Sequence, residues 1–184
     1  MNGSRRIGRR TLLACAALPF APPKGTLAAQ PALDAPNIVA ISPRLVTAGQ
    51  PTAASLATLK AQGFDADIYL APPSVPDAVR EEQAIVERQG LVYFNIPIRF
   101  DDPNEADYDA FAAAMARLAD RKVLVHCQVN MRASSLVFLH RVIVGDEPPD
   151  KAYEAVARVW SPRGPWKALI VKVLRKNGIG FEPY

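Results

Sequence analysis

An α/β layered domain is the fold that this sequence predicts, and three observations support it. Short apolar runs of strand length alternate with longer amphipathic segments along the chain. Glycine or proline stands at several of the junctions between these segments. The chain has 184 residues, of which 49% are hydrophobic, and this is enough for one core. We therefore expect a single domain built from layers of strands and helices.

Five strands are expected, each of them a short run rich in apolar residues. They cover residues 37–41, 45–48, 64–71, 91–98 and 122–126. Pro97 has no N–H to donate to a neighbouring strand, so the fourth strand should meet a sheet end or a bulge there. A linker over residues 30–37, rich in alanine and proline, should precede a folded domain that runs over 38–184.

Six helical segments are expected between and after these strands. They cover residues 53–62, 75–89, 104–120, 133–144, 150–159 and 165–176. Thr52 is the expected N-cap of the first helix, and Gly63 and Gly90 should end the first two. Two apolar stripes should face the core, namely Leu56, Leu59 and Ala61 on the first helix and Tyr108, Phe111, Met115 and Leu118 on the third.

Residues 1–29 have the pattern of an export signal. Four arginines precede a short apolar stretch, Thr11–Ala21, and small residues at 26–29 suit cleavage. The stretch is too short to span a bilayer. Gly8–Leu13 is similar to a twin-arginine signal, so we expect a periplasmic protein whose mature chain has no membrane span. A lipoprotein box ending at Cys15 and a disordered basic tail are the alternatives.

The charge and cysteine content change when this segment is set aside. Five of the 22 basic residues lie in residues 1–29, whereas all 18 acidic residues follow, so the remaining chain holds 17 basic and 18 acidic residues. A nucleic-acid partner therefore loses its compositional support. The remaining Cys127 has no intramolecular disulfide partner. It is an inert buried thiol, one half of an intermolecular bridge, or a reactive nucleophile.

The turn between the strand at 122–126 and the helix at 133–144 holds the residues best suited to catalysis. Cys127 follows the strand directly, and Arg132 comes five positions later. A tight turn with inward N–H groups, at the positive end of a helix, forms a cradle for an oxyanion and favours a thiolate at its mouth. Arg132 would add a planar, bidentate fork. The other residues expected to bind the substrate are His126, Gln128, Val129, Asn130, Met131 and Ser134.

These features together resemble the dual-specificity-like protein tyrosine phosphatase family, in particular bacterial proteins related to the beta-lactamase hydrolase-like phosphatases. The residues that carry the resemblance are His126-Cys127, Arg132 and the upstream Thr47-Ala-Gly-Gln-Pro-Thr52 before an amphipathic helix. It runs from about residue 38 to 144 and implies a phosphatase-like fold, in which helices flank a central, mostly parallel sheet. It also implies an enzyme without cofactor or metal that acts on a phosphorylated protein or small molecule.

The resemblance further implies roles for single residues. Cys127 would attack phosphorus, Arg132 and the loop N–H groups would hold the oxygens, and water would hydrolyse the phospho-cysteine. The general acid would lie in the loop that holds Asp101 and Asp102, and we favour Asp102. A solvated turn or a helix cap is the alternative for both aspartates. His126 should orient the loop or tune the thiol, although a simple hydrogen-bonded histidine fits equally well.

The loop also departs from the phosphatase pattern, which leaves other functions open. Four residues separate Cys127 from Arg132 instead of the usual five, none of them is glycine, and Ala133 stands where serine or threonine is common. Four residues is the spacing of rhodanese-like sulfurtransferases, in which Cys127 would carry a persulfide. A phosphate-binding module without turnover and an inert buried cysteine are further alternatives. His126 and His140 form no recognisable metal-ligand pattern.

Overall fold

The structure is a computed structural model that describes residues 32–184 of the chain. The predicted export signal and the start of the predicted linker lie outside the described residues. Within residues 32–184 the strands form a five-stranded sheet in the order β1-β2-β5-β3-β4. Its strands are β1 (Val39–Ser42), β2 (Leu45–Ala48), β3 (Ala66–Tyr69), β4 (Val92–Asn95) and β5 (Val123–His126).

The sheet is mostly parallel, as expected. β1 and β2 are antiparallel, whereas β2 with β5, β5 with β3 and β3 with β4 are parallel pairs. The edge strand β4 ends at Asn95, two residues before Pro97. The proline therefore marks a sheet end, because it could not continue the ladder of hydrogen bonds.

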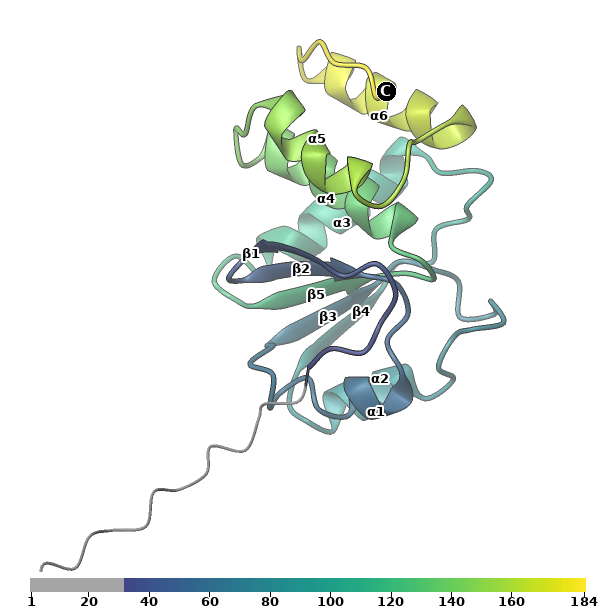
Figure 1. The fold of residues 1–184 in the computed structure, drawn as a ribbon, viewed down its shortest axis with the longest axis vertical. Helices are drawn as coiled ribbons and strands as arrows, with labels where there is room; N and C mark the ends of the chain where they lie inside the picture. The colour runs from purple at the N-terminus through teal and green to yellow at the C-terminus, as the bar shows by residue number, and fades with distance from the viewer. Residues whose placement is uncertain (1–31) are drawn as a thin grey trace, which may run out of the picture.

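Helices cover both faces of the sheet (Figure 1). Helices α1 and α2 lie on one face, and α3 to α6 lie on the other, where α4 packs on β2 and β5. Their bounds are α1 (Ala53–Leu56), α2 (Glu82–Glu87), α3 (Glu105–Ala116), α4 (Met131–Ile143), α5 (Pro149–Ala157) and α6 (Gly164–Lys176). In the part of the chain that the structure describes, no helix has the length and apolar character needed to cross a membrane.

The first helix is shorter than predicted, although its N-cap is confirmed. The Thr52 hydroxyl accepts a hydrogen bond of 3.2 Å from the Ser55 N–H. After Leu56 the chain continues in turns, because the Thr58 hydroxyl and the Gln62 amide both donate to the Ser55 carbonyl. Such side-chain bonds compete with a continuing helix. Ala61 is consequently exposed, and its predicted place on the packed face is wrong.

The second helix begins later than predicted. Residues 75–81 form turns in which Val75 donates to Pro72 and Ala78 donates to Val75. Backbone hydrogen bonds from a residue to the third residue before it, with no helical bonds following them, are typical of isolated turns. Gly90 is confirmed as the stop of this helix, since it has a positive φ of 75° and its N–H donates to the Glu87 carbonyl at the end of α2. Gly63 also has a positive φ, of 83°, but α1 already ends at Leu56, so Gly63 ends the turns that follow the helix.

Strand β5 is buried on both faces and separates two parts of the core. Val123 and Val125 belong to the cluster below α3 to α6, whereas Leu124 belongs to the smaller cluster below α1 and α2. Successive side chains of a strand alternate between its faces. Cys127 therefore continues toward α4, and His126 turns toward α2.

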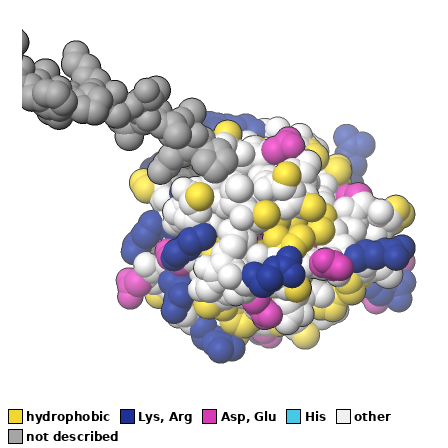
Figure 2. Space-filling view, turned by 90° about the horizontal axis from the view of Figure 1, so that it is seen from below, with side chains coloured by type: hydrophobic (Ala, Val, Ile, Leu, Met, Phe, Trp, Pro, Cys, Tyr) yellow, Lys and Arg dark blue, Asp and Glu magenta, His cyan; other side chains and the backbone are white. Residues whose placement is uncertain are grey.

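The outer surface over α1 and α2 is mixed in character. Basic and acidic side chains are interspersed there around apolar ones, and no histidine of residues 32–184 is visible in this view (Figure 2). His126 is fully buried beneath it.

Candidate active site

Cys127 stands at the base of a three-residue loop between β5 and α4. Helix α4 begins at Met131, two residues earlier than predicted, so the connecting loop is only Gln128 to Asn130. Asn130 makes the sharp turn in the left-handed region, with φ 69° and ψ 2°. Glycine usually occupies this region, but asparagine also adopts it. The absence of glycine from this loop therefore does not prevent a tight turn.

The loop is held in place from behind by segments that precede the first helix. The Asn130 amide donates to the Asn37 carbonyl at 2.6 Å and to the Thr47 hydroxyl at 3.0 Å. The Gln50 N–H donates to the Gln128 carbonyl at 3.0 Å. The end of the predicted linker is thus part of the site's support, since Asn37 contacts the loop and Pro36 accepts from the Gly49 N–H.

Gly49 is required by the close approach of this support to the loop. A Cβ at this position would lie 2.8 Å from the Gln128 carbonyl oxygen and 3.0 Å from Pro36. We expect Gly49→Ala to lower the free energy of unfolding by about 1–3 kcal/mol, because the backbone must move apart. Gly180→Ala is the matched control, since nothing lies within 4 Å of its Cβ, and it should change stability by less than about 0.5 kcal/mol. Denaturant titrations measure both variants, and an equal loss of unfolding free energy in Gly49→Ala and Gly180→Ala would contradict this account of the close contact.

Arg132 lies in the first turn of α4. It connects the Cys loop, which consists of Cys127 and residues Gln128 to Asn130, to the loop that follows β4. Its Nε donates to the Ile98 carbonyl at 3.0 Å, and its Nη1 donates to Gln128 Oε1 at 3.4 Å. The guanidinium is buried and lies 5.1 Å from the centre of the Phe100 ring. These bonds use two of the five N–H donors of the guanidinium. No residue within 32–184 accepts a hydrogen bond from the other three, so they can receive an oxyanion.

The Cys127 thiol is free and fully buried. The side chain of Gln128 bridges from Arg132 to Asp77, whose Oδ1 accepts a bond of 2.8 Å from Nε2. Asp77 is thereby an acidic group in direct contact with the Cys loop, and it is absent from the residues predicted from sequence.

The other predicted residues have varied surroundings. Asp101 is exposed and paired with Arg99 at 2.8 Å, and this hydrogen bond holds the pKa of Asp101 below its usual value. Asp102 is exposed in the same loop. Val129 is exposed, whereas Met131 is half-buried. The Ser134 hydroxyl donates to the Met131 carbonyl within α4.

An aromatic cluster lies beside Arg132. The Phe100 ring centre is 5.8 Å from each of Trp160 and Trp166, and the Trp166 indole N–H donates to the Phe100 carbonyl. Trp160 follows α5 and Trp166 lies in the first turn of α6, so the connection between these two helices packs against the loop that holds Phe100. Phe100 is 40% exposed, so part of this aromatic surface is open to a ligand.

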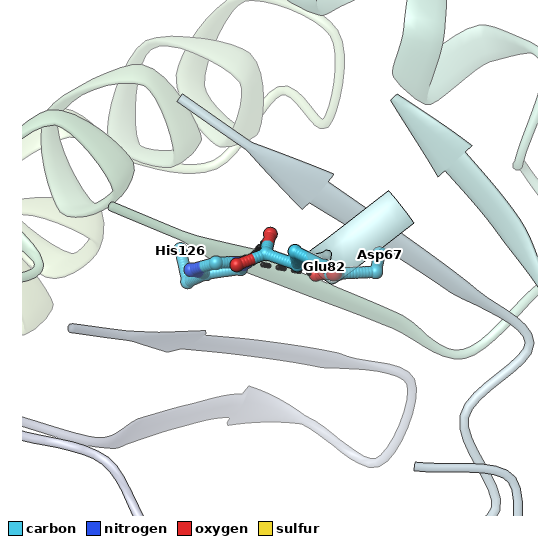
Figure 3. Close-up of side chains that lie close together, drawn as sticks. All are labelled: Asp67, Glu82 and His126. Carbon is cyan, nitrogen blue, oxygen red and sulfur yellow. Dashed lines mark ion pairs between the residues drawn. The ribbon is translucent and has the colours of Figure 1, made fainter. Parts of the chain in front are cut away.

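His126 lies on the opposite side of β5 from the thiol, in a buried cluster with two carboxylates. Its Nε2 is 3.3 Å from Asp67 Oδ1 and 3.1 Å from Glu82 Oε1 (Figure 3). Burial disfavours the imidazolium, yet Asp67 and Glu82 together raise the pKa of His126 to about 10. Burial also raises the pKa of Asp67. The ring is thus directed into the core, which fits an orienting role and places it away from a substrate at Cys127.

The comparisons with known proteins agree with this arrangement. Beta-lactamase hydrolase-like proteins from Xylella fastidiosa and Agrobacterium fabrum are 38% and 36% identical over 115 and 111 residues, which are 59% and 58% of this chain. The chain spans about a quarter of the length of these curated relatives (26% and 25%). No protein-family model matches the chain.

Solved structures cover more of the chain. A DUF442 protein of proposed phosphatase activity from Shewanella putrefaciens CN-32 is 30% identical, with a TM-score of 0.72 over 78% of this chain and 94% of that one. The chain belongs to the dual-specificity-like protein tyrosine phosphatase family. The catalytic domain of the PP-IP phosphatase SIW14 from S. cerevisiae shares the fold, with a TM-score of 0.61 at 14% identity over 80% and 96% of the two chains.

Membership of this phosphatase family confirms the resemblance and the fold predicted from the sequence, and the relatives support a phosphatase. Sequence reasoning missed Asp77, Phe100 and the partners of His126. Each of them reaches the site from a segment that is distant along the chain, with no spacing that would indicate it. The Pro72–Ala78 turns were one usable signal, because a proline-rich stretch argues against the long helix predicted there.

Proposed function

We propose that this protein is a Cys-dependent phosphatase that hydrolyses phosphate monoesters through a phospho-cysteine intermediate. The observation that supports it most is the short loop that places Cys127 at the positive end of the 13-residue helix α4, with Arg132 folded back to the loop. The thiolate attacks phosphorus while the bond to the leaving-group oxygen breaks. Water then cleaves the S–P bond, which releases inorganic phosphate and restores the thiolate.

The charge of the transferring phosphoryl group would be stabilised by fixed donors. Arg132 retains N–H groups for this purpose, and the backbone of the Cys loop and the N-terminus of α4 add positive potential. Such donors are effective because the protein holds them in position before the reaction. The hydrogen bonds from Asn130 to Asn37 and Thr47 would maintain that geometry.

An aryl phosphate, such as phosphotyrosine, fits the surroundings better than a phosphate on a small alkyl group. Phe100 is partly exposed beside Arg132 and is supported by Trp160 and Trp166. Aromatic rings stack or pack edge-to-face on such a surface. The proposed substrate class is therefore an aromatic phosphate monoester on a protein or a small molecule.

The leaving group needs a proton, and we propose Asp102 as its donor. It stands in the loop that Arg132 and Trp166 hold through Ile98 and Phe100. Asp102→Asn should slow hydrolysis of an alkyl phosphate by about 10²-fold or more, and that of a nitrophenyl phosphate far less, because only the poor leaving group needs the proton. The measurement is kcat/KM for both substrates.

Asp101→Asn is the matched control for this assignment. Asp101 is the adjacent residue, but its carboxylate is paired with Arg99, and a lowered pKa does not suit a proton donor near neutral pH. Asp101→Asn should leave the ratio of kcat/KM between the alkyl phosphate and the nitrophenyl phosphate unchanged. If Asp77→Asn alone produces the leaving-group effect, the acid is Asp77, and the assignment to Asp102 is wrong.

The test of the proposed function is which of two reactions the reduced protein catalyses. We expect hydrolysis of an aryl phosphate with release of inorganic phosphate, and no transfer of sulfur from thiosulfate to cyanide. The reverse result would establish a sulfurtransferase, which the four-residue spacing between Cys127 and Arg132 also allows. Phosphate binding without either reaction would indicate a binding module.

A further inference from the structure

The cluster behind the Cys loop contains buried polar atoms that are close together but make no well-formed hydrogen bonds. Within residues 32–184, both carboxylate oxygens of Asp67, Oε1 of Glu82 and both ring nitrogens of His126 are buried and make no hydrogen bond of good geometry, although His126 Nε2 lies within ion-pair distance of both carboxylates. Asp67 and His126 are fully buried, and Glu82 is 3% exposed. Buried polar atoms are nearly always satisfied by protein, water or an ion. One possible ligand atom from each side chain lies close to the other two, and the three side chains come from three elements, β3, α2 and β5.

The spacing of the three side chains is that of ligands around one small metal ion. Zn²⁺ lies about 2.0–2.2 Å from imidazole nitrogen and carboxylate oxygen, and tetrahedral angles then place neighbouring ligand atoms about 3.4 Å apart. His126 Nε2 is 3.3 Å from Asp67 Oδ1 and 3.1 Å from Glu82 Oε1. One ligand atom from each residue lies within 4.8 Å of the others. We propose that Asp67, Glu82 and His126 bind one divalent transition-metal ion, with Zn²⁺ as the best fit.

Charge and donor chemistry favour this ion over others. A metal ion would displace the proton that His126 otherwise holds between the two carboxylates. The neutral imidazole and the two carboxylates then carry a charge of −2, which a divalent cation neutralises inside the core. One nitrogen and two oxygen donors suit Zn²⁺, whereas Ca²⁺ needs six or more oxygens, and Mg²⁺ needs an octahedron of oxygens and keeps several waters. Gln50 Nε2 donates to the second oxygen of Glu82 at 2.6 Å, as outer residues do to carboxylate ligands of metals.

The site would be structural and would not take part in the chemistry at Cys127. Its ligands are buried between β5 and α2, on the opposite face of the sheet from the thiol. The ion would join β3, β5 and α2 directly behind the Cys loop. Gln50 extends this connection, because its backbone N–H donates to the Gln128 carbonyl within the loop. This inference goes beyond the phosphatase activity and does not depend on it.

The test uses the full-length chain with both cysteines replaced, Cys15→Ser and Cys127→Ser, so that no thiol binds metal. After treatment with a chelator and addition of Zn²⁺, we expect one ion per chain by elemental analysis. Zn²⁺ at 100-fold above its Kd should raise Tm by about 5–10 °C. Asp67→Asn and Glu82→Gln, made in this background, should each abolish both effects. Glu87→Gln is the matched control, since it is exposed on the same helix and should change neither.

If the cysteine-free chain neither binds Zn²⁺ nor shows a rise in Tm, the proposal is overturned. The three side chains would then be bridged by protons alone. Binding that persists in both Asp67→Asn and Glu82→Gln would overturn it as well, because the ion would then lie elsewhere. If one variant fails to fold, the other variant and the cysteine-free parent still decide the question. Phosphatase activity of the wild-type chain is measured separately, so either result leaves the proposed function to its own test.

Discussion

Replacing Cys127 by serine is expected to lower kcat/KM for an aryl phosphate by on the order of 10⁴-fold or more. Serine has nearly the same size, but its hydroxyl is a far weaker nucleophile than a thiolate at neutral pH. The buried position at the base of the loop tolerates this exchange, so the fold should persist. The measurement is steady-state hydrolysis by the reduced protein, beside circular dichroism and denaturant unfolding of both forms.

The outcome separates catalysis at Cys127 from simple phosphate binding. A phosphate competitor should still bind to Cys127→Ser, because Arg132 and the loop N–H groups remain. Retention of a tenth or more of the activity in a folded Cys127→Ser protein would contradict the proposed nucleophile. Loss of both activity and folding would be uninformative alone, and Cys127→Ala then provides a second variant without a polar group in the buried position.

Replacing Arg132 by lysine is expected to lower kcat/KM by about 10²–10³-fold. Lysine keeps the positive charge but lacks the planar fork that contacts both Ile98 and Gln128 and still presents donors to a phosphoryl group. Arg132→Ala should cost at least as much activity and should also lower stability, because the Ile98 carbonyl loses its partner. Kinetics and unfolding of both variants test this.

Arg141→Lys is the matched control on the same helix. Arg141 lies near the other end of α4 and makes a two-point contact with Glu147. Its replacement should lower the free energy of unfolding and leave kcat/KM unchanged. If Arg141→Lys reduces activity as much as Arg132→Lys does, the effect of Arg132 comes from stability and not from substrate contact.

The strands were the most predictable part of this fold, and the helices before β4 were the least. Apolar runs and the positions of Pro97 and Gly90 are local signals, and each has the expected structural effect. The helices predicted over 53–62 and 75–89 are short because side chains and tertiary contacts override local propensity. The Ser55 carbonyl, for example, is taken by side chains that no periodic pattern reveals.

The Cys loop was predictable as a motif but not in its detail. Cys127 and Arg132 occur together in the sequence, whereas Asp77 and Gln128 meet only through the turns before α2. The structure also resolves the doubt over a loop without glycine, because Asn130 adopts the left-handed conformation itself. An isolated asparagine does not signal such a conformation in a sequence.

The buried cluster around His126 could not be predicted from the sequence either, because it also depends on contacts between distant segments. Asp67 and Glu82 come from β3 and α2, far from His126 along the chain, and no metal-ligand spacing connects them. A lone histidine before a cysteine is compatible with many surroundings. Only the sheet register, which pairs Tyr69 with His126 and so puts Asp67 on the same face, brings the three side chains together.

The most direct test of the central claim is to look for the covalent intermediate. The reduced protein is mixed with an aryl phosphate, quenched in acid during turnover, digested and analysed by mass spectrometry. The account predicts a phosphoryl group on the peptide that contains Cys127, and its absence from that peptide in Cys127→Ser. Steady turnover with an unmodified Cys127 peptide, or with phosphate on another residue, would contradict a phospho-cysteine mechanism.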